Sequence, residues 1–270
     1  MTFLRTSKGT LEIRELAGID EMMAAENIQK SVWGLETVTH PKELLIPVQA
    51  EGGLLAGAFT SDKELIGLIF GFPTNVPTAL HSQLLATLES WRGEGIGTSL
   101  KWFQRQWCLE RGIQEVRWTV DPLRAANADV NIRHLGGISS TYYPDYYGVM
   151  QGIDAGGPTD RLLVDWHLNS QRVAGRAKQQ PEDSGFPDAQ AALVMGDNGV
   201  PSRLLLDLSC PSILVRIPSD FLNLAKVNSE LALQWRLITR QLFQNYFFKG
   251  YQITEFTRLN GPAYLLEKGL

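Results

Sequence analysis

Three closely spaced glycines carry the clearest chemical signal in the sequence. They lie in the run Arg92-Gly-Glu-Gly-Ile-Gly97, which follows a strand-like segment and precedes a helix-like one. Glycines let the backbone turn tightly and approach a ligand without obstruction by a Cβ atom. The first turn of a helix adds N–H donors without helical partners and a partial positive charge. The run therefore predicts an anion site for phosphate or pyrophosphate, with an ordinary strand-to-helix turn as the alternative.

Three phosphate-binding patterns can be compared with this run. A Walker loop ends in Gly-Lys-Ser/Thr, whereas Gly97 is followed directly by Thr98. A dinucleotide fingerprint needs Gly-x-Gly-x-x-Gly, and here the third glycine comes one residue early; Glu115, about twenty residues on, keeps that interpretation open. The pattern Arg/Gln-x-x-Gly-x-Gly/Ala is matched at every position by Arg92, Gly95 and Gly97. The third pattern therefore fits best.

A histidine that precedes the glycine run by eleven residues is the first candidate for acid–base chemistry. His81 lies near the start of the strand-like segment 80–88. An unperturbed pKa of about 6.5 suits a histidine to accept a proton near neutral pH. Packing or hydrogen bonding within a strand is the alternative role. Glu51 and Glu89 are further candidates.

The elements that must position these residues alternate between strands and helices. Apolar positions at helical spacing predict helices over 17–33 and 98–111. Two apolar runs, 53–59 and 64–72, flank a polar turn and predict a β-hairpin. Further strands are expected over 11–14, 80–88, 115–120 and 162–168, and a short helix over 125–135.

The chain divides at a segment rich in glycine, proline and polar residues. Residues 171–190 predict a linker between a domain over 1–170 and a C-terminal α/β region over 191–270. In that region we expect strands over 203–208, 213–217 and 251–256, and a long helix over 221–248. The order strand–helix–strand recurs in both halves, so a degenerate duplication is one interpretation.

The glycine run and the order of elements together resemble the GCN5-related N-acetyltransferase (GNAT) superfamily over roughly residues 9–150. More closely, the sequence resembles a subgroup of predicted acetyltransferases with an extra C-terminal region. The runs that carry this second resemblance are 25–34, 67–73, 121–123, 127–128, 146–148 and 158–161. The resemblance implies a GNAT fold of the α/β (α+β) class, with a mixed central sheet flanked by helices, and a C-terminal region that could be a degenerate second GNAT-like unit.

The resemblance also implies an acyl-coenzyme A site, for acetyl-CoA or another thioester. In the family the strand before the loop splays from its neighbour, and the pantetheine arm pairs with the freed edge, here 86–89. A backbone N–H of Thr87 or Leu88 would polarise the thioester carbonyl, where charge develops in the transition state. The remaining implied contacts are Glu89 on that edge, Asn127 on the pantetheine, Arg92 beside the phosphates, and the pyrophosphate loop itself, which consists of Gly93, Glu94, Gly95, Ile96, Gly97 and Thr98.

For catalysis, the resemblance assigns His81 to deprotonation of an attacking amine. The family often uses a tyrosine to protonate the leaving thiolate, and Ile132 stands at that place, four residues before Gly136. Four tyrosines that cluster around residue 144 could take over this role, with Tyr143 and Tyr147 as the named candidates beside Tyr142 and Tyr146. Such a cluster also suits a core or a pocket wall.

The composition of the chain argues against several classes of protein. The chain has 270 residues, 44% hydrophobic and 20% charged, with a net charge of −4, which argues against a protein bound to nucleic acid or anionic lipid. The longest apolar stretches are far below the roughly 20 residues that span a bilayer, and the first residues contain no secretory core, so we expect a cytoplasmic protein. Two cysteines and four histidines without metal-ligand spacing predict neither a disulfide framework nor a metal.

Three functions remain open. The first is an N-acyltransferase that moves an acetyl group, or a larger one such as succinyl, from CoA to a primary amine of a small molecule such as an amino acid. The second is a non-catalytic CoA-binding module, which Ile132 supports. The third, a dinucleotide oxidoreductase, is disfavoured by the glycine spacing. Residues 171–270 could be a second acyltransferase-like domain, a lid or a dimerisation surface, so a homodimer is also open, but no second CoA site is expected there.

Overall fold

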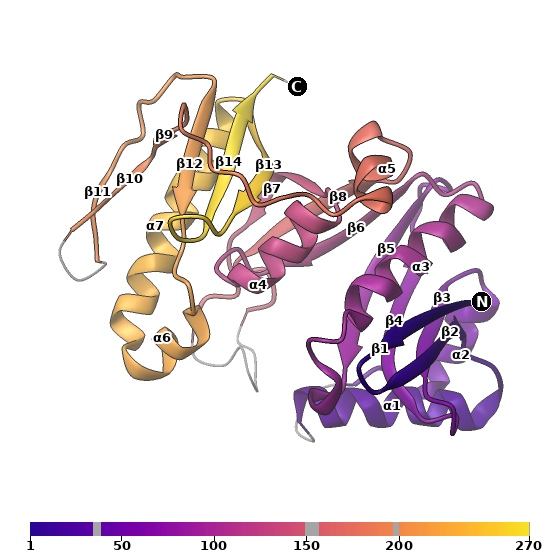
Figure 1. The fold of residues 1–270 in the computed structure, drawn as a ribbon. Helices are drawn as coiled ribbons and strands as arrows, with labels where there is room; N and C mark the ends of the chain where they lie inside the picture. Colours follow the sequence, from indigo (N-terminus) through magenta and orange to yellow (C-terminus); the bar gives the residue numbers. More distant parts are fainter. Residues whose placement is uncertain (35–38, 149–156, 197–199, 270) are drawn as a thin grey trace. The chain divides into compact units, whose positions relative to one another are not determined.

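The computed structural model describes residues 1–34, 39–148, 157–196 and 200–269 (Figure 1). Internal contacts divide the chain into two compact units. The first consists of Met1–Trp118 with His167–Asn169, and the second is the rest of the described chain from Thr119 onward. The boundaries expected at 170 and 190 stay predictions. Among the described residues, no helix is long and apolar enough to cross a membrane.

The first unit is built on a mixed sheet. Its strands lie in chain order: β1 (Thr2–Thr6), β2 (Gly9–Glu15), β3 (Leu54–Phe59), β4 (Leu65–Pro73), β5 (Ala79–Thr87) and β6 (Glu115–Val120). Neighbouring strands pair antiparallel except β5 and β6, which run parallel. The predicted hairpin is confirmed as β3 and β4. Strand β1 is largely exposed and therefore shows no apolar alternation by which the sequence could reveal it.

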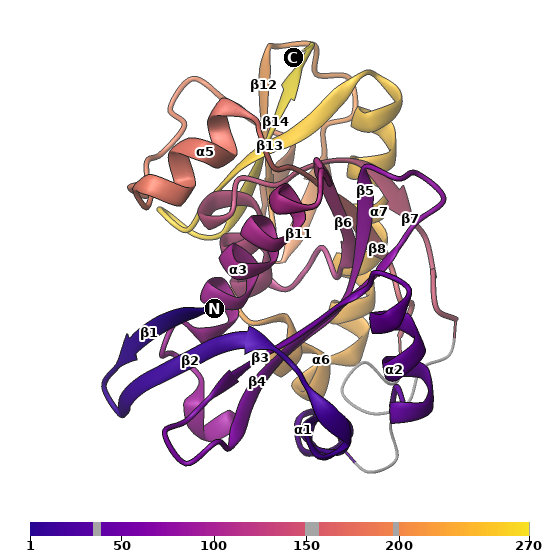
Figure 2. The same ribbon diagram turned by 90° about the vertical axis from the view of Figure 1, so that its right-hand side faces the viewer.

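Helices cover both faces of this sheet (Figure 2). Helices α1 (Gly18–Trp33) and α2 (Lys42–Ala50) lie on one face, where α1 side chains join a buried core with strand residues such as Leu68 and Phe70. Helix α3 (Ile96–Glu110) packs on the other face against Gly67, where an added Cβ atom would lie 2.7 Å from the Ile96 side chain. Helices α1 and α3 were predicted, whereas α2 was missed because it contains a proline, Pro47.

The second unit contains a sheet in the order β8-β7-β13-β14-β12-β9 and a separate pair, β10 and β11. Its strands are β7 (Ile138–Tyr143), β8 (Arg161–His167), β9 (Gln190–Ala191), β10 (Leu193–Met195), β11 (Pro201–Leu204), β12 (Ser212–Arg216), β13 (Tyr251–Thr257) and β14 (Ala263–Lys268). Its helices are α4 (Ala125–Ala128), which continues as a π-helical turn over Asp129–His134, α5 (Gln171–Lys178), α6 (Phe221–Val227) and α7 (Ser229–Phe248). The mixed sheets and flanking helices confirm the predicted α/β class.

The single helix expected over 221–248 is in fact two helices, α6 and α7. Asn228 separates them because its backbone is extended (φ −152°, ψ 84°) and its side chain accepts a hydrogen bond from the Leu231 N–H, which caps α7.

The segment 171–190, expected as a linker, begins with helix α5. The Ser170 side chain caps this helix by accepting a hydrogen bond from the Val173 N–H, 3.2 Å away. Arg172 and Arg176 of α5 form ion pairs with Glu255 of β13, so the helix is fixed to the sheet of the second unit.

Candidate active site

The glycine run forms the entry to helix α3, as the sequence predicted. Gly93 and Gly95 have φ angles of +85° and +76°, a conformation that L side chains rarely adopt. Gly95 is the N-cap of α3, and its carbonyl accepts the first helical hydrogen bond, from the Ser99 N–H at 3.0 Å. The N–H groups of Ile96, Gly97 and Thr98 therefore lie in the first turn, where a helix supplies no carbonyl partners. This end of α3 is suited to bind an anion.

Directly before this loop, β5 leaves its parallel neighbour. Strand β5 pairs with β6 at Ala79, Leu80 and His81, and no pairing between the two described strands follows the last of these, His81 with Arg117. Pairing with β4 on the other side continues to Thr87, with a bulge at Gln83. The stretch of β5 after His81 thus has an edge that β6 does not cover. A bound chain can add to such an edge as an extra strand.

The hydrogen bond of Leu88 distinguishes between the two predicted donors to a thioester carbonyl. The Leu88 N–H donates to the Ile66 carbonyl at 3.0 Å, so it is used by the sheet. N–H groups of successive strand residues point to opposite edges. The Thr87 N–H therefore faces the edge that β6 leaves uncovered, and Thr87 is the better placed donor of the two.

Three charged residues accompany the loop. Arg92 is exposed and lies 3.9 Å from the Glu89 carboxylate in the short 3-10 turn Glu89–Trp91, at the end of the splayed edge. The Glu94 carboxylate accepts hydrogen bonds from Ser7, at 2.9 Å from its backbone N–H and also from its hydroxyl. These bonds lower the pKa of Glu94, so the carboxylate is ionised at neutral pH.

His81 lies on the face of the sheet opposite α3. Its ring stacks on Phe72, with centroids 4.9 Å apart, and Phe72 packs against the core beneath α1. Burial, and secondarily the charge of Lys101, lowers the pKa of His81 below its usual value of 6.5. The imidazole is therefore neutral at pH 7 and able to accept a proton.

Lys101 is a buried amine that the sequence interpretation missed. Its side chain extends from α3 to the point where β5 and β6 separate. There its Nζ donates to the Ser82 hydroxyl at 2.8 Å and to Gln104 at 3.1 Å, and lies 3.6 Å from the centroid of the Trp118 ring. Burial lowers the pKa of Lys101 from 10.5 to about 7. The missed signal is a lysine on the buried face of α3, next to Leu100 and three residues before the equally buried Gln104.

Replacing Lys101 by methionine should flatten the pH dependence of stability. Because burial lowers the pKa, the unfolded chain binds one proton more than the folded chain between about pH 7 and 10.5, and stability rises with pH over this window. Between pH 7 and 9.5 the wild type should gain about 3 kcal/mol relative to Lys101→Met. Urea unfolding at both pH values tests this, and parallel changes in the two proteins would show that Lys101 is ionised in the folded state.

The candidate residues Tyr143, Tyr147 and Asn127 belong to the second unit. Tyr143 stacks on Tyr146 with centroids 4.8 Å apart, and the Tyr147 hydroxyl lies 3.1 Å from that of Thr119. Tyr147 is 45% exposed, so its hydroxyl is not confined to a core. Asn127 is exposed in α4. Ile132, by contrast, is 1% exposed and belongs to the core.

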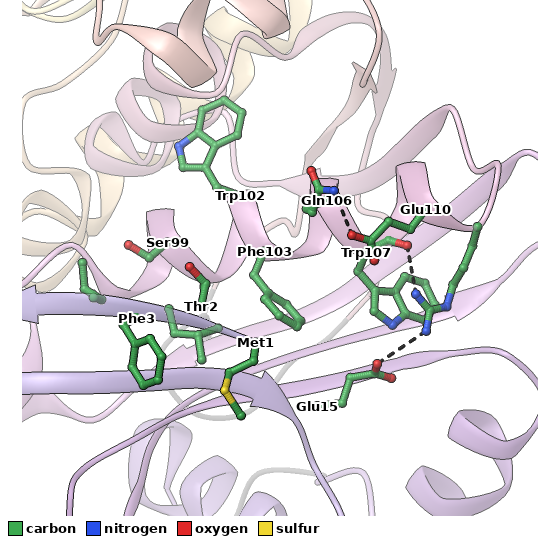
Figure 3. A pocket seen from close by; sticks show the side chains of 13 residues that line it. Met1, Thr2, Phe3, Glu15, Ser99, Trp102, Phe103, Gln106, Trp107 and Glu110 are labelled. Atoms are coloured by element: carbon green, nitrogen blue, oxygen red, sulfur yellow. Dashed lines mark hydrogen bonds and ion pairs between the residues drawn. The ribbon is translucent and has the colours of Figure 1, made fainter.

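A separate pocket of about 470 Å³ opens between α3 and the first two strands (Figure 3). Phe3, Trp102 and Phe103 contribute apolar groups to its lining, and two further lining residues, Arg111 and Glu15, form an ion pair at 3.5 Å. None of the predicted site residues is among those that line it. This pocket therefore does not coincide with the loop and the splayed edge.

Residues 22–130 match the sequence model of the acetyltransferase (GNAT) family. No curated protein matches the chain. Among solved structures, the ribosomal-protein-S18-alanine N-acetyltransferase from Escherichia coli is similar at 16% identity and a TM-score of 0.49, over 59% of this chain and 95% of that one. Ard1 from Thermoplasma volcanium is similar at 18% identity and a TM-score of 0.46, over 57% and 95%. The family match confirms the resemblance based on the glycine run.

Proposed function

The chain carries an acetyltransferase domain of the GNAT family at residues 22–130, and from this premise we propose that it acylates the primary amine of a small molecule. The donor is acetyl-CoA or a larger thioester such as succinyl-CoA, and an amino acid is the acceptor class. The observation that carries the proposal is the divergence of β5 from β6 after His81, directly before an anion-binding loop at the start of α3.

The two parts of this site suit the two parts of coenzyme A. The first-turn N–H groups of α3, with Gly93 and Gly95 before them, are suited to hold the pyrophosphate, and Arg92 adds a positive charge beside it. The uncovered edge of β5 offers backbone groups to the amides of the pantetheine arm. The Thr87 N–H is suited to stabilise the charge that develops on the thioester oxygen.

The transfer itself needs a neutral amine. The amine nitrogen attacks the thioester carbonyl, a C–N bond forms, and the C–S bond breaks with release of the CoA thiolate. His81 takes the proton that the amine loses, since its lowered pKa keeps the ring neutral at pH 7. Tyr143 and Tyr147 are the candidates for protonating the thiolate, because Ile132 cannot donate a proton.

Calorimetric titration with acetyl-CoA, succinyl-CoA and NAD tests the proposal. We expect saturable binding of one thioester per chain and no binding of NAD, because the glycine spacing suits pyrophosphate but departs from the dinucleotide pattern. The thioester that binds is then the donor in a screen of amines, with the released thiol as the readout.

The outcomes separate the alternatives. Thioester binding without turnover on any amine would favour a non-catalytic CoA-binding module. The buried Ile132 supports that alternative, because it stands where the family often has a tyrosine that donates a proton. NAD binding in competition with CoA would favour an oxidoreductase. Binding of neither would overturn the proposal and leave the glycine run as a structural turn.

A further inference from the structure

The turn between β1 and β2 is joined to the glycine loop by residues far apart in the sequence. Both carboxylate oxygens of Glu94 accept hydrogen bonds from Ser7, 87 residues earlier, one from its backbone N–H at 2.9 Å and one from its hydroxyl. Lys8, the next residue of the turn, donates to the Ser90 carbonyl and lies 5.1 Å from the centroid of the Trp91 ring. The turn thus binds the loop on both sides of Arg92.

The turn is itself braced for this contact. The Thr6 hydroxyl donates to the Gly9 carbonyl at 2.8 Å and accepts from the Lys8 N–H at 3.1 Å. These bonds close the turn locally, so the positions of Ser7 and Lys8 depend little on the loop that they contact. The turn can therefore act as a fixed support for a glycine-rich segment that has few conformational restrictions of its own.

Glu94 creates an electrostatic conflict that this contact resolves. Its carboxylate lies within the loop, between Gly93 and Gly95, and immediately before the helix end suited to bind pyrophosphate. Hydrogen bonds from Ser7 lower the pKa of Glu94, so the negative charge is present at neutral pH. A free carboxylate there would repel phosphate or occupy the same N–H donors. Held by Ser7 through both oxygens, it is directed to the β1–β2 turn instead.

We propose that Ser7 is a positioning residue of the coenzyme A site, which holds the Glu94 carboxylate away from the pyrophosphate. This role rests on the proposed function, because it requires the diphosphate to bind at the first turn of α3. Lys8 supports it by fixing the segment before Arg92 to the same turn. Through Ser7 and Lys8, the β1–β2 turn thus supports the loop without contributing a group to the chemistry.

A double-mutant cycle on Ser7 and Glu94 tests the role. In Ser7→Ala the carboxylate loses one of its two bonds and can turn to the loop, so the Kd for acetyl-CoA should rise roughly five-fold. Glu94→Gln removes the charge and serves as the second background of the cycle. In that background the Ser7→Ala change should alter the Kd by no more than about two-fold, because no carboxylate is left to repel the phosphates. Thr10→Ala, an exposed change on the same hairpin, is the matched control.

Acetylpantetheine, which lacks the diphosphate, separates repulsion from general damage to the loop. Its kcat/KM should stay within about two-fold of the wild type in all four variants, and the Ser7→Ala effect on acetyl-CoA should shrink at high salt.

An unchanged Kd in Ser7→Ala, or an equal rise in Kd on adding Ser7→Ala to Glu94→Gln, would overturn the role of Ser7 while leaving the proposed function intact. A wild type that binds no acetyl-CoA would instead overturn the proposed function and the role together.

Discussion

Replacing Gly95 by aspartate should abolish acetyl-CoA binding while the chain keeps its fold. Gly95 is the N-cap of α3 with φ +76°, and a Cβ atom added there meets no other atom within 4 Å. Aspartate and asparagine tolerate the left-handed conformation better than most residues do. The strain of a non-glycine residue at this one position should lower the stability without preventing α3 from forming. The carboxylate would lie where the pyrophosphate is proposed to bind.

The expected loss follows from the repulsion between like charges. Two unit charges about 4 Å apart near a protein surface repel by about 4 kcal/mol, which corresponds to roughly a 1,000-fold rise in Kd. Gly95→Asn adds the same bulk without the charge and should raise the Kd by no more than about ten-fold. Calorimetric titration gives both constants, and thermal melting checks the fold.

The comparison of the two Gly95 variants is decisive for the placement of the site. Equal losses in both would mean that the shape of the loop, rather than its charge, governs binding. Undiminished affinity in Gly95→Asp would remove the pyrophosphate from this end of α3.

Replacing His81 by alanine should lower kcat/KM at pH 7 by about 10²- to 10⁴-fold, the usual contribution of a general base. The Kd for acetyl-CoA should be unchanged, because the ring lies on the face of the sheet opposite α3, stacked on Phe72. His81→Gln keeps a polar side chain of similar size without a base and should lose as much activity. His167→Ala, which removes an exposed histidine, is the matched control.

The pH profile gives an independent readout of the same residue. Burial lowers the pKa of His81, so the wild-type kcat/KM should fall as the pH drops through a midpoint below 6.5. The fall comes from protonation of the base, and it should be absent in His81→Ala. If both proteins keep the same acidic limb, another group accepts the proton.

Some elements of this structure are determined by residues that lie close together in the sequence. Helices α1 and α3 and the β3–β4 hairpin follow from apolar spacing over a few turns or strands, because each such pattern records which face of one element is buried. The glycine loop was also recognisable, since Gly93 and Gly95 meet a local need for positive φ. The resemblance to the acetyltransferase family followed from the spacing of Arg92, Gly95 and Gly97 and from the order of the elements, and the sequence model of that family matches residues 22–130.

Other features depended on partners distant in the chain, and the sequence could not reveal them. The register of β5 against β4 makes the Leu88 N–H donate to the Ile66 carbonyl. The Thr87 N–H points to the opposite edge of the strand and makes no such bond. The end of β6 pairing at His81 opens the edge of β5, and α3 buries Lys101 beneath that point.

The contact of Ser7 with Glu94 spans 87 residues and leaves no local pattern. Local patterns encode which face of an element is buried and which turns it permits. The topology of the sheet determines which polar groups contact each other. This topology is fixed only when the whole chain packs.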